Sequence, residues 1–172
     1  MPHFGHNEIV EEKLAISDLL SRFFQSFDDH DWSMMRSCLC DEVHTDYSSF
    51  RNVPASTITG DHYVEQRRVA LHTLDMQHNF LNLRIVLQDE TKSAAEARCN
   101  YIIHRFHPTF DGTNDHFFHS YGNYVFELLK VDNEISSNAE WRIAKITQNL
   151  LRNYGNREIH GATRTHENSQ HI

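Results

Sequence analysis

The spacing of apolar residues changes once along the chain, and this change constrains the fold more than any other feature. Over residues 8–28 the apolar side chains recur with the period of about 3.6 that is typical of an amphipathic helix, namely at Ile16, Leu19, Leu20, Phe23, Phe24 and Phe27. After residue 74 the period becomes two, which predicts long strands over residues 76–88, 94–107, 117–130 and 140–151. Helices followed by a run of strands predict an α+β domain in which N-terminal helices pack on one face of a curved antiparallel sheet.

Shorter elements lie between the first helix and the long strands. Asp31 is suited to cap a helix over residues 32–39, and alternation over residues 42–47 predicts a strand with Val43, Thr45 and Tyr47 on one face. A further helix is expected from the Thr59-Gly60-Asp61 signal to about residue 74. Turns are expected at 89–92 and 132–134 and a loop at 108–115. Residues 1–157 would form one domain with room for a core and a ligand cavity, followed by a polar tail at 158–172.

Composition argues against several classes of partner. The formal net charge is −8 and the Lys and Arg residues are scattered, whereas nucleic-acid-binding surfaces concentrate positive charge. The apolar runs are far shorter than a membrane-spanning helix requires. Three cysteines suggest no disulfide framework, and no secretory signal is visible, so we expect a cytoplasmic protein. No glycine-rich phosphate loop occurs, and no cofactor is expected.

Asp28 is the first residue that does not fit its surroundings. It lies one helical turn beyond Phe24 and therefore continues the apolar stripe. A carboxylate in such a place must be paired, border a cavity or shift its pKa upward. The alternative is that Asp28 ends the helix in solvent beside Asp29 and Asp31.

His78 is the second such residue, at the beginning of the first long strand. Strict alternation places its side chain on the same face of the strand as Phe80, Asn82, Arg84 and Val86. The opposite face would carry Gln77, Asn79, Leu81, Leu83, Ile85 and Leu87. A histidine here is either a hydrogen-bonded structural residue or a group that exchanges protons near neutral pH.

Three separated motifs join these two residues. The stretches Ser-Phe-Asp-Asp-His-Asp-Trp at 26–32, Thr-Asp-Tyr-Ser-Ser-Phe at 45–50 and Gln77-His78 resemble scytalone dehydratase in residue type and spacing. The helix that ends in Asp28 and the strand from His78 are similar, more loosely, to hexachlorocyclohexane dehydrochlorinase and the SnoaL-like proteins. The resemblance covers roughly residues 16–141. It implies a cone-shaped α+β barrel of the nuclear transport factor 2-like (cystatin-like) kind, with a mostly apolar pocket at its open end.

The resemblance also implies an activity. The family's dehydratases are cofactor-free lyases that act on small apolar or aromatic molecules, so a β-hydroxy carbonyl, polyketide-like or steroid-like substrate is expected, as is assembly into dimers or trimers. His78 matches the catalytic histidine, Asp28 the aspartate bonded to it, Tyr47 a tyrosine that polarises the substrate carbonyl through water, and His104 a second pocket histidine if one residue is inserted before it. The substrate-binding residues that we expect are Phe24, Phe27, Phe50 and either Asn123 or Tyr124. Phe27 replaces a second carbonyl-binding tyrosine, so the substrate should differ from scytalone.

Other functions remain open from the sequence. His104-x-x-His107 and His116-x-x-His119 suggest zinc, but residues three apart on a strand face opposite sides, so no metal site is expected. An isomerase of the same fold could use Asp46 beside Tyr47, although alternation separates these two side chains. A small-molecule binding protein without chemistry is the third possibility, since a fold does not determine a function. The matched acid and histidine argue against it.

Overall fold

The computed structural model describes residues 6–88, 93–108, 116–132 and 139–159. The helices are α1 (His6–Asp28), α2 (Trp32–Ser37), α3 (Ser48–Arg51) and α4 (Gly60–Leu71). The strands are β1 (Leu39–Asp46), β2 (Ser56–Thr59), β3 (Asp75–Leu87), β4 (Ala94–Phe106), β5 (Phe117–Asp132) and β6 (Ala139–Gly155). The predicted order of helices and long strands is confirmed, whereas α3 and β2 were not predicted. Some of the predicted segments lie outside the described residues. They are the turn at 89–92 and most of the loop at 108–115, of the turn at 132–134 and of the tail at 158–172.

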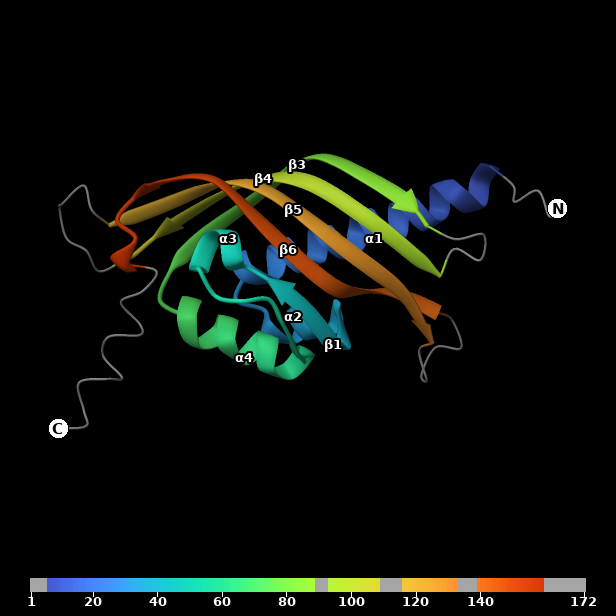
Figure 1. Ribbon diagram of the computed structural model, residues 1–172, viewed down its shortest axis with the longest axis horizontal. Helices are drawn as coiled ribbons and strands as arrows, with labels where there is room; N and C mark the ends of the chain where they lie inside the picture. Colours follow the sequence, from blue (N-terminus) through green and yellow to red (C-terminus); the bar gives the residue numbers. More distant parts are fainter. Residues whose placement is uncertain (1–5, 89–92, 109–115, 133–138, 160–172) are drawn as a thin grey trace.

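The strands form one open sheet in the order β2-β1-β6-β5-β4-β3, with β2 and β3 at its edges (Figure 1). Strands β3 to β6 pair in antiparallel fashion, as the alternating pattern predicts. Strand β1 pairs in parallel with β6, so the sheet is mixed at this one place rather than wholly antiparallel.

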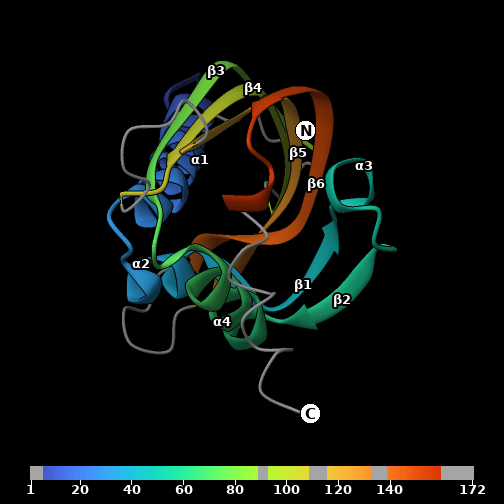
Figure 2. The same cartoon turned by 90° about the vertical axis from the view of Figure 1, so that its left-hand side faces the viewer.

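The sheet is strongly curved, and α1, α2 and α4 lie on its concave side (Figure 2). Figure 2 shows the long strands arching over α1, α2 and α4. The apolar stripe of α1 is buried there, with exposed fractions of at most 3% for Ile16, Leu19, Leu20, Phe23 and Phe24. The predicted α+β class is therefore confirmed, with a curved sheet that does not close into a complete barrel.

The end of α1 is fixed by a backbone cap. His30 has a left-handed conformation (φ 54°), its N–H bonds to Phe27 O, and the N–H of Asp31 bonds to Ser26 O. This pair of hydrogen bonds is the Schellman arrangement, which ends a helix at a defined residue. It makes Asp28 the last helical residue and sets the direction of its side chain.

A bulge in β3 changes the face on which its later residues lie. The register against β4 shifts between Leu81 and Arg84, and Asn82 has a positive φ of 55°. Before the bulge His78 and Phe80 face the helices, and after it Leu83, Ile85 and Leu87 also pack against the core. The prediction that His78 and Leu83 face opposite sides is therefore wrong, because the extra residue shifts the alternation by one.

The chain beyond β6 folds back against α3. Ile159 is 1% exposed, and Arg157 Nη2 donates a hydrogen bond to Phe50 O at 2.7 Å. Residues 158 and 159, which the sequence pattern assigns to the tail, thus contact the folded domain. No helix in the described part of the chain has the length and apolar character of a membrane span.

Candidate active site

Asp28 and His78 form a close pair between α1 and β3. His78 Nδ1 lies 2.6 Å from Asp28 Oδ1. The backbone N–H of His78 donates to both carboxylate oxygens, at 3.0 Å to Oδ1 and 2.9 Å to Oδ2. Since the carboxylate only accepts, Nδ1 carries the proton in this contact and Nε2 is the nitrogen left as a base.

The His78 ring is almost completely enclosed. Its side chain is 4% exposed, against 23% for that of Asp28. Phe27 stacks on it with 4.7 Å between ring centroids, and Phe24 lies behind at 6.1 Å. Burial lowers the pKa of His78, and although Asp28 acts in the opposite direction, the charge of Arg105 lowers that pKa further. The imidazole is therefore neutral at neutral pH.

The position of Asp28 is unfavourable for the helix itself. A helix C-terminus carries partial negative charge and disfavours a carboxylate, and α1 has no basic residue in its last turn. The three hydrogen bonds from His78 are what stabilises the carboxylate there. An acid in this position is thus explained by its contact with His78 rather than by helix stability.

His78 borders a small cavity of about 20 Å³. That is room for about one water molecule. Four aromatic residues that the resemblance identifies line it, namely Phe27, Tyr47, Phe50 and Tyr124. The rest of the lining consists of three arginines, Arg51, Arg67 and Arg105, with Leu71 and Gln148. The resemblance implies a mostly apolar pocket, and the cationic side chains are a departure from it.

Tyr47 reaches the cavity from the end of β1. Its hydroxyl lies 2.7 Å from that of Tyr63 on α4. Tyr63 is 0% exposed, and burial raises its pKa well above the ordinary value, so it stays protonated. Tyr63 can therefore donate to Tyr47 and leave the Tyr47 proton for a ligand.

The structure brings most of the expected site residues together. Asp28 and His78 are bonded, and Tyr47, Phe27, Phe50 and Tyr124 line the same cavity. Of the two alternatives on β5, Tyr124 is the inward residue. Asn123 is exposed and accepts a hydrogen bond from Asn149.

His104 does not lie in the cavity, and its prediction as a pocket residue is wrong. Alternation along β4 buries Ile103 and Arg105 on the concave side, and His104 faces the other way. There its ring meets that of His119 on β5, with 4.5 Å between centroids. The match of His104 with the family's second pocket histidine assumed one inserted residue. A shift of one residue along a strand places a side chain on the opposite face.

The residues of the rival hypotheses have other partners. The Asp46 carboxylate accepts hydrogen bonds from the backbone and hydroxyl of Ser48, at 3.0 and 2.6 Å, at the start of α3. It is therefore engaged outside the cavity. Among the described residues, no group of three or more His, Cys, Asp or Glu side chains is arranged to hold a metal ion.

Three polar residues of the site were not predicted. Tyr63 and Arg67 lie four residues apart on the buried face of α4, and Arg105 follows Tyr101 and Ile103 in the inward alternation of β4. The periodic pattern contains all three. Because arginine is seldom buried, Arg67 and Arg105 are not expected inside a protein, even though the periodic pattern places them there.

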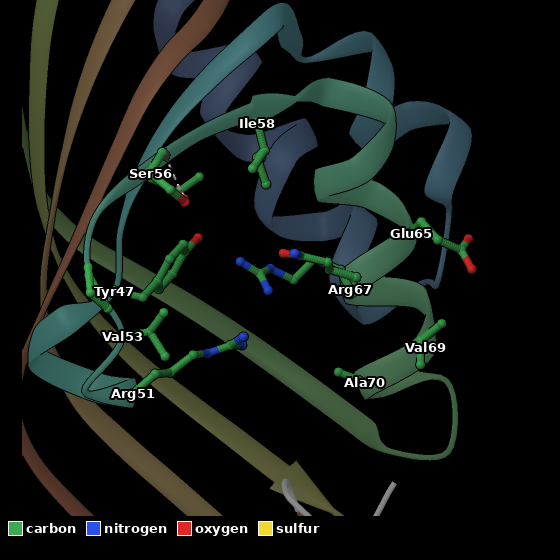
Figure 3. Close-up of a pocket in the computed structure, with 12 residues that line it drawn as sticks. Tyr47, Arg51, Val53, Ser56, Ile58, Glu65, Arg67, Val69 and Ala70 are labelled. Carbon is green, nitrogen blue, oxygen red and sulfur yellow. Dashed lines mark hydrogen bonds between the residues drawn. The ribbon is translucent and has the colours of Figure 1, made fainter. Parts of the chain in front are cut away.

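A larger pocket adjoins the cavity. It has a volume of about 370 Å³ and shares three lining residues with the cavity, Tyr47, Arg51 and Arg67. Figure 3 shows the guanidinium groups of Arg51 and Arg67 pointing into the space beside Tyr47. A molecule in this pocket would reach His78 past these three side chains.

Known structures share this fold at low sequence identity. The Kfla4162 protein from Kribbella flavida matches with a TM-score of 0.76 and 15% identity, over 89% of this chain and 99% of its own. A candidate scytalone dehydratase from Novosphingobium aromaticivorans gives 0.70 and 14%, over 87% of this chain and 91% of its own. A hexachlorocyclohexane dehydrochlorinase, LinA-type3 from Novosphingobium barchaimii, gives 0.68 and 14%, over 87% and 93%.

No curated protein sequence matches this chain. The structural likenesses, at these identities, establish the fold, and they include proteins named as a dehydratase and a dehydrochlorinase. The family model described as a SnoaL-like domain matches residues 8–147, most of the chain. The chain therefore belongs to the SnoaL-like domain family, within the nuclear transport factor 2-like superfamily.

Proposed function

We propose that the protein is a cofactor-independent lyase that eliminates water from a β-hydroxy carbonyl compound. The observation that carries the proposal is the 2.6 Å contact between Asp28 and a His78 ring that is 4% exposed and borders a cavity. A neutral imidazole held in one tautomer by a carboxylate is suited to accept a proton and return it.

The reaction would need only this one acid–base group. His78 Nε2 takes the proton from the carbon next to the carbonyl, and the C–H electrons form the enolate. The enolate then expels the β-hydroxyl group, which leaves as water after it takes the proton back from His78. Asp28 stabilises the imidazolium between the two steps. No second histidine is required, in agreement with the position of His104 outside the cavity.

Tyr47 would stabilise the enolate oxygen. Its hydroxyl lies 2.7 Å from that of Tyr63, and with Tyr63 as the donor in this contact the Tyr47 proton is available to a ligand. Removing one such donor typically lowers the rate by about 10²–10³-fold. Phe27 contributes no hydroxyl, but its stacking holds the His78 ring in place.

A panel of β-hydroxy ketones and acids with aromatic or polyketide-like bodies tests the proposal, with loss of one water followed by mass spectrometry. We expect wild-type protein to dehydrate at least one compound. His78→Ala and Asp28→Asn should each lower turnover by about 10²–10⁴-fold and keep the native circular dichroism spectrum. His104→Ala is the matched control, because its ring lies on the other face of β4.

The outcomes separate the rival functions. Near-normal turnover in both His78→Ala and Asp28→Asn would exclude the mechanism. A product of unchanged mass would indicate an isomerase instead. Binding of panel compounds with no product would indicate a small-molecule binding protein.

A further inference from the structure

Two arginines beside His78 are buried without a carboxylate partner. Arg67 is 3% exposed and Arg105 is 4% exposed. Within the described residues, neither forms an ion pair, and one buried donor on each has no hydrogen-bond acceptor: Nη1 of Arg67 and Nε of Arg105. A buried cation without a counterion is costly, so this arrangement calls for an explanation.

The neighbours of Arg67 offset only part of that cost. Its guanidinium lies over the rings of Tyr63 and Tyr47, 4.4 and 4.7 Å from their centroids. Stacking on aromatic faces stabilises a cation, but Nη1 of Arg67 remains a buried donor without an acceptor. An anion would use this donor.

Arg105 is in a similar position on β4. Its Nη1 donates to Ser120 Oγ at 2.9 Å, and its guanidinium carbon lies 5.7 and 5.6 Å from the ring centroids of Phe50 and Phe118. Burial lowers the pKa of Arg105 to about 10. The group therefore remains positively charged at neutral pH, and no Asp or Glu is among the described residues that line its cavity.

The adjoining pocket does not supply the missing anion. Among the residues that line it, Glu65 is the one with a carboxylate, and this carboxylate is 2.6 Å from Arg68 Nη2. Figure 3 shows Glu65 pointing away from Arg67 and Arg51. The remaining lining near these arginines includes apolar side chains, among them Val53, Ile58 and Val69.

We propose that Arg67 and Arg105 bind a carboxylate of the substrate, so that the molecule processed here is an organic acid rather than a neutral compound. A carboxylate has two oxygens that accept charge-assisted hydrogen bonds, which matches one open donor on each of the two arginines. The inference rests on the proposed function for the reaction, and it adds the class of substrate.

The two spaces divide the substrate between them. The carboxylate lies in the cavity shared by Arg67, Arg105 and His78, and the apolar body occupies the pocket of about 370 Å³ beyond Tyr47. Because the cavity alone has about 20 Å³, the Arg51 side chain between the two spaces moves aside when the acid enters. The carboxylate then holds the reacting carbons close to His78 Nε2.

Benzoate and benzamide test the inference without knowledge of the true substrate. They have nearly the same shape, and only benzoate is charged. By titration calorimetry, wild-type protein should bind benzoate about tenfold or more tightly than benzamide, the range expected for charge-assisted hydrogen bonds. The difference should disappear in Arg105→Met and Arg67→Met and persist in part in Arg105→Lys.

Arg98→Met is the matched control. Arg98 lies on the same strand as Arg105, but its side chain is 59% exposed on the other face and is paired with Glu96. This variant should keep the full preference for benzoate. Equal binding of benzoate and benzamide by the wild type, or an equal loss of preference in Arg98→Met and Arg105→Met, would overturn the inference. Circular dichroism of each variant identifies any that is unfolded. If Arg105→Met is unfolded, the benzoate preference of Arg67→Met and of Arg105→Lys tests the inference instead.

The result is separable from the proposed reaction. His78→Ala should lower turnover by about 10²–10⁴-fold and retain the preference for benzoate, since the ring is not one of the anion donors. Dehydration of neutral β-hydroxy ketones at the rate of matched acids would refute the carboxylate inference and leave the lyase proposal standing. Tight benzoate binding that depends on Arg105, with no dehydration of any compound, would support the carboxylate inference and refute the lyase proposal.

Discussion

Two sets of ionisable groups meet at one cavity, which His78, Arg67 and Arg105 line, and the two sets differ in whether their hydrogen bonds are complete. Asp28 is a carboxylate whose contacts are complete, because it accepts three hydrogen bonds from His78. Arg67 and Arg105 are guanidinium groups whose contacts are incomplete, because each retains a buried donor without an acceptor. The first set is stable as it stands, and the second would gain from a ligand.

This difference teaches which part of the site is ready before a ligand arrives. A base that is already oriented pays no cost of reorganisation during the reaction. Cations left without partners instead lower the stability of the free protein, and proteins accept such a loss at sites that serve function. Stability measurements on single variants should therefore differ in sign between the two sets.

Asp28→Ala should produce the largest loss. It removes the acceptor for the His78 backbone N–H and for Nδ1, both in a residue whose side chain is 4% exposed. The expected loss in the free energy of unfolding is about 2–3 kcal/mol, after a small gain from relieving the helix terminus. Urea unfolding measures it. Asp29→Ala, at the exposed next residue, is the control and should change stability by no more than about 0.5 kcal/mol.

Arg105→Met should have a smaller effect of the opposite sign. Methionine fills much of the same space and removes an unpaired buried charge, although Ser120 loses one partner. We expect the free protein to be more stable by about 1–2 kcal/mol. A rise in the urea midpoint with an unchanged m-value would show it. A loss comparable to that of Asp28→Ala would mean that Arg105 is a structural residue, and the comparison would fail.

The same contrast separates what the sequence could predict from what it could not. The amphipathic stripe of α1 and the alternation of the long strands depend on side-chain burial, and burial leaves a periodic pattern in a sequence. The segment from Ser48 to Thr59 has no such pattern, because α3 and β2 are four residues each and Asn52 and Pro54 interrupt them. Strand β2 forms by pairing with β1, and α3 lies against β6, so both depend on contacts with other elements rather than on a local pattern.

For the site, residue type was a poorer guide than position. His104 has the type expected of a catalyst, yet the alternation through Tyr101 and Ile103 places Arg105 in the cavity. The bulge at Asn82 has no counterpart in strict alternation, since one residue of positive φ shifts the strand without altering its composition. The positions of Asp28 and His78, at the end of an apolar helical stripe and at the start of a strand, singled them out, and the resemblance to scytalone dehydratase joined them as a pair.

The smallest expected effect connects the two sets directly through the pKa of His78. The groups that face this ring are Asp28 from α1 and Arg105 from β4, with Arg51, Arg67, Tyr47 and Tyr124 around the same cavity. A nearby cation disfavours the imidazolium, so Arg105→Met should raise the pKa of His78. A carboxylate partner favours the imidazolium, so Asp28→Asn should lower that pKa.

The sign of each change is visible in two measurements. Imidazole NMR signals followed against pH report the His78 pKa without a substrate. If His78 is the base, kcat/KM falls on the acid side as the ring takes up a proton, and in wild type this limb lies below the ordinary histidine pKa of about 6.5 because burial lowers the pKa. Arg105→Met should move the limb toward neutral pH.

Benzoate should raise the pKa of wild-type His78 that NMR reports, because a bound anion compensates the charge of Arg105. In Arg105→Met, benzoate should leave this pKa unchanged. A pKa that responds to neither the substitution nor the anion would show that the two sets, although they share a cavity, act independently.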